Sequence, residues 1–237
     1  MQFPVPLQPA QLVRRYQRFL ADVILPGGEP LTVHVPNTGS LLGCLTPGSP
    51  VWLSDSGNPE RRCRFTWEQV AVGGARVGIN THRANALVGE ALEQGLLPGL
   101  GNYINKRSEV RYGTEKSRID WLLSAPGLPD CYLEVKNVTA AVDQGIALFP
   151  DAVSTRGTKH LRELMGMVRE GARAVLVFCV QRDDVTEVRP ADQIDPDYGR
   201  TLRQVLEGGV EAYALRATLD ERQVRLTHLI PINCPPE

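Results

Sequence analysis

Short apolar segments alternate with turn residues through the first third of the chain. Each segment is followed by glycine, proline or asparagine, and the segments cover residues 19–25, 31–35, 51–54 and 62–72. Several short strands separated by such turns are typical of a small β-barrel. We therefore expect residues 1–80 to form an OB-like β-barrel domain.

A helical pattern follows the predicted barrel. Thr81 or Asn80 can cap a helix over residues 81–97, and its apolar stripe recurs at helical spacing in Ala84, Leu87, Val88, Ala91 and Leu92. Gly95 and Pro98 end the pattern. We interpret residues 81–102 as a helix and loop at the junction of two domains.

The second half alternates strands and helices. Strand-like segments at 117–124 and 131–139 are joined by a turn, and a helical pattern follows at 155–171. Residues 174–180 form a continuous apolar run, which fits a strand buried on both faces. An acidic connection, a helix around 198–206 and two strand-like segments at 210–219 and 223–230 complete the chain. This order predicts an α/β (α+β) domain over residues 81–237, with a mixed sheet flanked by helices.

Composition narrows the class of protein but does not identify a ligand. The chain has 237 residues, 42% of them hydrophobic, and a formal net charge of -1. No apolar run is long enough to span a bilayer, and the N-terminus lacks a secretory pattern, so we expect no membrane association. The cysteines are scattered and form no C-x-x-C pair, which favours a reducing, cytoplasmic location over a zinc site or disulfides. No feature indicates whether the chain forms a homo-oligomer.

Two acids and one amine stand out in the second half. Glu134 and Lys136 lie two apart within one predicted strand, so they share a face, and Asp120 lies in the preceding strand. Two carboxylates on neighbouring strands can share a Mg²⁺ or Mn²⁺ ion, while a nearby lysine orients water and stabilises a phosphate. The alternative is a surface charge pair without chemistry, and the triplet alone favours that alternative.

Flanking residues support the chemical interpretation. Glu109 could supply a further carboxylate to the metal. Arg156, Lys159 and His160 lie at the start of a predicted helix, where a phosphate is favoured by the helix N-terminus and by nearby cations. A solvated helix face is the competing explanation, and a hydrogen-bonded structural role is the competing one for His160.

Several motifs together resemble the bacterial and archaeal sugar fermentation stimulation protein A family. The resemblance covers essentially the whole chain, and its motifs are PNTGSL at 36–41, NT at 80–81 with AN at 84–85, SRIDWLL at 117–123, LEVKNVT at 133–139, and FPDAV at 149–153 with RG and KHL before residue 162. The resemblance implies an N-terminal OB-like domain and a C-terminal domain of the PD-(D/E)xK nuclease fold. It also implies sequence-nonspecific DNA binding linked to regulation of sugar (maltose) metabolism.

The resemblance places Asp120, Glu134 and Lys136 at the nuclease core positions. We also expect Arg118 to bind nucleic acid, together with Arg156, Lys159 and His160. Ile119 stands where the motif has proline. A literal Pro-Asp pair exists at Pro129 and Asp130, but it lies in the turn only four residues before Glu134, so we prefer Asp120.

Three functions follow from these observations. The first is a DNA-binding regulator on a nuclease-like scaffold, and the second is an active Mg²⁺- or Mn²⁺-dependent endonuclease. Both carboxylates and the lysine are present, which favours activity. The third, a sugar-metabolising enzyme, is disfavoured because the chain has no phosphate-binding glycine loop and no dinucleotide fingerprint.

Overall fold

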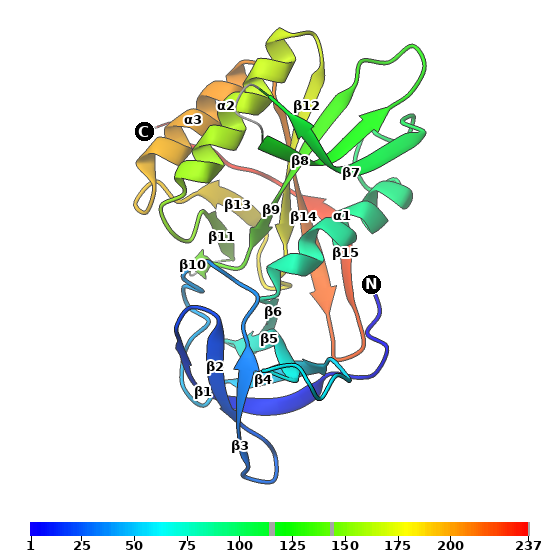
Figure 1. Ribbon diagram of the computed structural model, residues 1–237. Helices are drawn as coiled ribbons and strands as arrows, with labels where there is room; N and C mark the ends of the chain where they lie inside the picture. Colours follow the sequence, from blue (N-terminus) through cyan, green and yellow to red (C-terminus); the bar gives the residue numbers. More distant parts are fainter. Residues whose placement is uncertain (114–116, 143–144, 237) are drawn as a thin grey trace.

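Two domains stacked end to end form the protein (Figure 1). The computed structural model describes residues 1–113, 117–142 and 145–236. The β-rich N-terminal part lies at one end, and a larger sheet with helices lies at the other (Figure 1). No helix in the described ranges is long and apolar enough to cross a membrane.

The N-terminal strands form a closed barrel. Its sheet has the order β3-β2-β1-β4-β5-β6, and an additional parallel pairing of β3 with β5 closes a five-stranded ring. The predicted OB-like barrel is therefore confirmed. The strands are β1 (Gln8–Tyr16), β2 (Leu20–Ile24), β3 (Pro30–His34), β4 (Pro50–Asp55), β5 (Phe65–Val72) and β6 (Ala75–Gly78).

Inward-facing apolar side chains fill the barrel. Trp67 at the centre of β5 is fully buried, and its indole N–H donates to the backbone carbonyl of Gln69, so burial leaves no indole donor unpaired. The sequence pattern missed β1, in which Ala10 and Leu12 point inward while Val13 is exposed. Two inward residues were too few to reveal an alternation.

The junction contains a short 3-10 turn, η1 (Thr81–Arg83), followed by α1 (Ala84–Glu93). The Asn80 side chain caps η1 by accepting a hydrogen bond from the His82 N–H. All five residues of the predicted apolar stripe are buried, but the α-helix ends four residues earlier than expected. Gly95 adopts a positive φ of 69° just after its end, the conformation that commonly terminates helices.

A six-stranded mixed sheet forms the C-terminal domain. Its order is β15-β14-β12-β9-β8-β7, in which β9, β12 and β14 are parallel and the remaining pairs are antiparallel. The predicted mixed sheet is confirmed. Its strands are β7 (Asn105–Tyr112), β8 (Ser117–Ser124), β9 (Cys131–Val138), β12 (Arg173–Val180), β14 (Glu211–Leu219) and β15 (Val224–Ile230).

Helices cover both faces of this sheet. α1 shares one hydrophobic core with Leu133 and Val135, whereas α2 (Thr155–Arg169) and α3 (Pro196–Glu207) share the other core with Leu176 and Phe178. Successive apolar side chains of β12 point to opposite faces of the sheet and pack into the two cores in turn, as expected for a strand that is covered on both sides.

A second, small sheet was not expected. It consists of β10 (Ala141–Val142), β11 (Ile146–Phe149) and β13 (Glu187–Pro190). The segment predicted as an acidic connection therefore contains a strand. Val188 and Pro190 are buried there, while Glu187 and Arg189 form an ion pair with each other at the partly exposed edge.

The two domains are joined by contacts beyond the chain connection. The N-terminal amine of Met1 donates to Glu90 and to the Val224 carbonyl, so the first residues run along the sheet domain. Asp151, in the loop before α2, accepts from the Leu41 backbone N–H at 3.0 Å. The Met1 contacts therefore hold the N-terminal segment at α1 and β15, and the Asp151 contact holds a barrel loop at the segment before α2.

Candidate active site

A local irregularity in β8 presents Asp120. The ladder between β7 and β8 pairs Ser108 with Trp121 and Val110 with Ile119, but skips the pair between them, and Glu109 has a positive φ of 56°. Ile119 and Leu122, three apart, belong to the same core, so the side-chain alternation slips by one residue at this point. The pairs on both sides keep the same register, so neither strand has an extra residue, and the irregularity is a local break in the ladder at Glu109 and Asp120.

The Asp120 carboxylate fills the gap where β8 and β9 separate. Their ladder extends only over Trp121 to Leu123, and beyond it the Val135 N–H of β9 donates to Asp120 Oδ2 at 2.7 Å. Asn85 Nδ2 of α1 donates to Oδ1 at 2.8 Å. Burial, followed by repulsion from the Glu134 carboxylate, raises the pKa of Asp120 to about 6 in spite of these bonds.

Glu134 lies beside Asp120 with a different set of partners. It is 3% exposed, and its Oε1 accepts from Lys136 Nζ at 2.7 Å and contacts His160 Nδ1. Burial acts to raise the pKa of Glu134, but the Lys136 ammonium and the His160 contact outweigh it, so the pKa is lowered. The predicted shared face of Glu134 and Lys136 is observed.

A cleft of about 950 Å³ contains this group and lies between the two domains. Its floor is β8 and β9, and one wall is the start of α2. The other wall belongs to the barrel side, through Asn37, Thr38 and Gly39. Every site residue expected from the sequence lines the cleft, namely Glu109, Arg118, Asp120, Glu134, Lys136, Arg156, Lys159 and His160.

The expected nucleic-acid contacts fall into two groups. Arg118 is exposed at the rim, 4.0 Å from Glu109, and Arg156 and Lys159 come from the first turns of α2. His160 is instead buried, with its Nδ1 against Glu134 and its Nε2 accepting from Arg156 Nε at 3.3 Å. Its position favours orientation of Glu134, so the structure supports the structural alternative for this histidine.

Family comparisons agree with the fold. Residues 82–223 match the profile described as the sugar fermentation stimulation protein RE domain, and residues 13–79 match that of the SfsA N-terminal OB domain. The chain belongs to the sugar fermentation stimulation protein family.

Relatives in this family match over nearly their full length. The chain is 56% identical to a sugar fermentation stimulation protein homolog of Alkalilimnicola ehrlichii, over 99% of this chain and 100% of the relative. It is 54% identical to a homolog of Thioalkalivibrio sulfidiphilus, with 98% of each covered. A solved structure described as Pyrococcus furiosus SfsA in complex with Ca²⁺ superimposes with a TM-score of 0.86 at 26% identity, covering 98% of each chain.

In this protein, the carboxylate oxygens of Asp120 and Glu134 at the cleft floor fit a hard divalent cation that takes few protein ligands. Glu134 Oε2 is buried and has no hydrogen-bond partner. In the described part of the chain, no group of three or more acidic, histidine or cysteine side chains is arranged to hold a metal, so Glu109 is not gathered with the other two carboxylates. Mg²⁺ commonly takes one or two carboxylates and completes its shell with water and phosphate.

Some site residues were not singled out from the sequence. Asn85, 35 positions from Asp120, orients that carboxylate, and Asn137 accepts from Gln181 Nε2 at 2.5 Å on the strand that carries Lys136. Asp151 fixes the barrel loop at Gly39, whose Cα has no room for a Cβ because the Asp151 carboxylate would lie 2.5 Å away. The shared motifs around residues 36–41, 84–85 and 149–153 were the available signal.

Proposed function

We propose that this protein binds DNA in the cleft between barrel and sheet and hydrolyses phosphodiester bonds there with a divalent cation. The observation that carries the proposal is the placement of Asp120 and Glu134 together on the cleft floor, with Lys136 bonded to one of them and Glu134 Oε2 free of hydrogen bonds. An unpartnered carboxylate oxygen at a buried position is costly unless a cation or water occupies the space beside it.

The cation-binding role is assigned to Asp120 and Glu134. A divalent cation there supplies positive charge to the phosphate and makes nearby water more acidic. The Pyrococcus furiosus relative solved in complex with Ca²⁺ supports a divalent cation on this scaffold. Repulsion between the two carboxylates, which contributes to the raised pKa of Asp120, is the electrostatic condition that a cation relieves.

The protein residues position the reactants. His160 and Asn85 hold the two carboxylates from opposite faces of the sheet, so both are oriented before a substrate arrives. Lys136 lies where an ammonium can stabilise the scissile phosphate and orient the attacking water. The N-terminus of α2, with Arg156 and Lys159, gives the neighbouring phosphates both backbone N–H groups and cations.

Cleavage of plasmid DNA tests the hydrolytic step. Wild-type protein is incubated with plasmid in Mg²⁺, in Mn²⁺ and in EDTA, in parallel with Lys136→Ala and Lys106→Ala. Lys106 is a matched control because it pairs with Glu93 outside the cleft. We expect metal-dependent nicking by wild type and Lys106→Ala, and at least a 100-fold loss in Lys136→Ala. Equal products from both lysine variants would assign the cleavage to a contaminant.

Binding without cleavage is the second candidate function. Lys136 Nζ is held by Glu134 and lies 3.3 Å from His160 Nδ1, and such an internal contact can keep the amine from the substrate. The protein would then be a DNA-binding regulator, and the family name, sugar fermentation stimulation protein, supports a link to sugar metabolism only. Duplex binding that weakens steeply with salt, together with intact plasmid in every metal, would leave this function in place of hydrolysis.

A further inference from the structure

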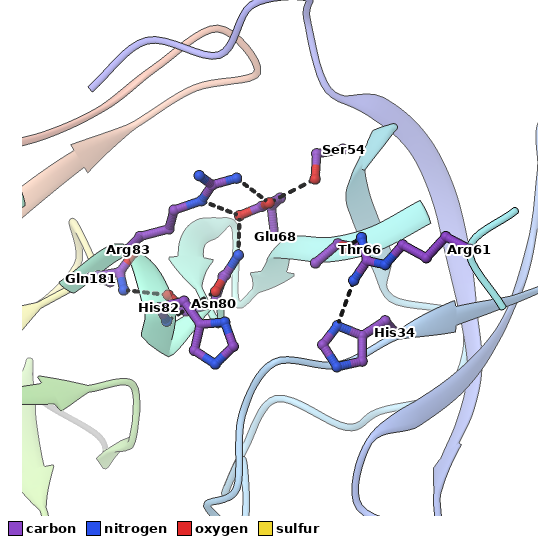
Figure 2. A network of polar contacts seen from close by, with 9 residues as sticks. All are labelled: His34, Ser54, Arg61, Thr66, Glu68, Asn80, His82, Arg83 and Gln181. Carbon is purple, nitrogen blue, oxygen red and sulfur yellow. Dashed lines mark hydrogen bonds and ion pairs between the residues drawn. The ribbon is translucent and has the colours of Figure 1, made fainter. Parts of the chain in front are cut away.

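A second cavity opens on the barrel. It has a volume of about 450 Å³ and lies where β3, β4 and β5 meet the loop that connects β4 to β5. Phe3, Pro4 and Val5 supply an apolar wall, and Val5 is 59% exposed. The opposite wall is polar. Figure 2 shows this polar network, in which an arginine–glutamate cluster and an arginine–histidine pair line the same cavity.

The two carboxylates in the wall are already engaged. Glu68 is 2% exposed and receives hydrogen bonds from Arg83, Ser54 and Asn80 (Figure 2). Asp55 is held by two nitrogens of Arg64. Each negative charge therefore has a guanidinium of its own, which leaves the remaining cationic groups of the cavity available for a ligand.

Those remaining groups are Arg61, His34 and His82. Arg61 donates to the Thr66 hydroxyl at 3.1 Å and approaches His34 Nδ1 at 3.3 Å, so its partners among the described residues are neutral. Burial, and then the positive charges of Arg61 and His82, lower the pKa of His34. An anion placed among Arg61, His34 and His82 would favour the protonated form of His34.

The barrel cavity and the cleft that contains Asp120 share part of their lining. His82 lines both cavities, and of two consecutive residues Pro36 lines the first and Asn37 the second. The 3-10 turn that carries His82 is the element that lies between the two cavities. Asn80 donates to Glu68 on the barrel side and caps this turn, which fixes the turn against the barrel.

We infer that the barrel cavity binds one unpaired nucleotide of a DNA strand, with its phosphate at Arg61, His34 and His82 and its base against Phe3, Pro4 and Val5. The volume suits a small ligand, and a base paired within a duplex could not enter such a recess. This inference rests on the proposed function, because the strand held here continues into the cleft that contains Asp120 and Glu134. The protein is thereby directed to DNA that has a single-stranded segment.

Adjacent arginines provide a matched test. Arg61 lines the cavity, whereas Arg62, also exposed and in the same loop, does not. Binding of a fluorescent 12-nucleotide thymidine strand is measured in EDTA by anisotropy over a range of salt, for wild type, Arg61→Gln and Arg62→Gln. We expect Arg61→Gln to bind about 5- to 10-fold more weakly and to lose about one phosphate contact from the salt slope, and Arg62→Gln to stay within about twofold. Equal weakening in both variants overturns the inference.

A blunt duplex and two small anions distinguish a nucleotide site from other phosphate sites. Arg61→Gln should bind the duplex as wild type does, and an equal loss for duplex and single strand would contradict a site for an unpaired nucleotide. In proton NMR, thymidine monophosphate should raise the titration midpoint of His34 at concentrations where inorganic phosphate does not. The same effect of both anions, or no effect of either, would also overturn the inference.

Failure of the proposed function would look different. If no metal supports DNA cleavage but Arg61→Gln still loses single-strand binding selectively, the result supports the nucleotide site and contradicts the proposed hydrolysis. If Lys136-dependent DNA cleavage is observed while Arg61→Gln and Arg62→Gln bind the single strand equally well, the result supports the proposed hydrolysis and contradicts the barrel site. His34→Gln gives a second variant that removes a cavity group on β3 without changing the loop.

Discussion

Replacing Asp120 with asparagine should make the metal-free protein more stable at neutral pH while abolishing the proposed hydrolysis. Asp120 is a carboxylate placed for chemistry in surroundings that disfavour its charge, because burial and the neighbouring Glu134 both act against ionisation. Asparagine has the same shape without the charge. Its carbonyl can accept the Val135 N–H, and the amide of Asn85 can turn over to accept from the new side-chain N–H.

The magnitude follows from the raised pKa. The folded-state pKa of Asp120 is about 6, against 3.8 for an unperturbed aspartate, and each pH unit corresponds to about 1.4 kcal/mol. Ionised Asp120 therefore lowers the free energy of unfolding by up to about 3 kcal/mol above pH 6. The folded protein binds this proton more tightly than the unfolded chain does, so the penalty develops between about pH 4 and 6 and is absent below pH 4. We expect Asp120→Asn to gain about 1–3 kcal/mol at pH 7.

Urea unfolding in EDTA, followed by tryptophan fluorescence at pH 4 and pH 7, measures this difference. Asp130→Asn is the matched control, because Asp130 lies in the exposed turn before β9. The gain should be present at pH 7, disappear at pH 4 and be missing in the control. An Asp120→Asn protein that is less stable than wild type at pH 7, or equally changed at both pH values, would refute the assigned charge penalty. Addition of Mg²⁺ should stabilise wild type but not the variant.

Two further predictions concern the elements that frame the cleft. Gly157→Ala should lower the free energy of unfolding by about 1 kcal/mol, because a Cβ there would lie 2.6 Å from the Ser154 Oγ that caps α2. Gly166→Ala is the control in the same helix, and because it has open space around it, this change should be neutral or slightly stabilising. Urea unfolding of both variants measures the difference. Asp151→Ala should leave the Leu41 N–H without its side-chain acceptor and lower the free energy of unfolding by about 1–2 kcal/mol. The barrel loop should then be cut faster in limited proteolysis. An unchanged rate of proteolysis would show that other contacts hold the loop.

Local patterns were sufficient for most elements of the chain. The stripe from Ala84 to Leu92, the apolar run in β12 and the turn residues of the barrel each depend on near neighbours in the chain, so periodicity revealed them. The sequence pattern did not predict strands that have few inward-facing apolar residues. β13 has only Val188 and Pro190 facing a core, and its acidic surroundings read as a connection.

The sequence by itself also determined which chemical groups, two carboxylates and an amine, are candidates for the site. Alternation placed Glu134 and Lys136 on one face of a strand, and the short spacing between Asp130 and Glu134 favoured Asp120 over Asp130. Tertiary structure alone decided how these groups meet. The slip in β8, the separation of β8 from β9 and the arrival of Asn85 from α1 set the direction and the pKa of Asp120. Such contacts join residues far apart in the chain through packing and strand register, and neither is encoded in the spacing of neighbouring residues.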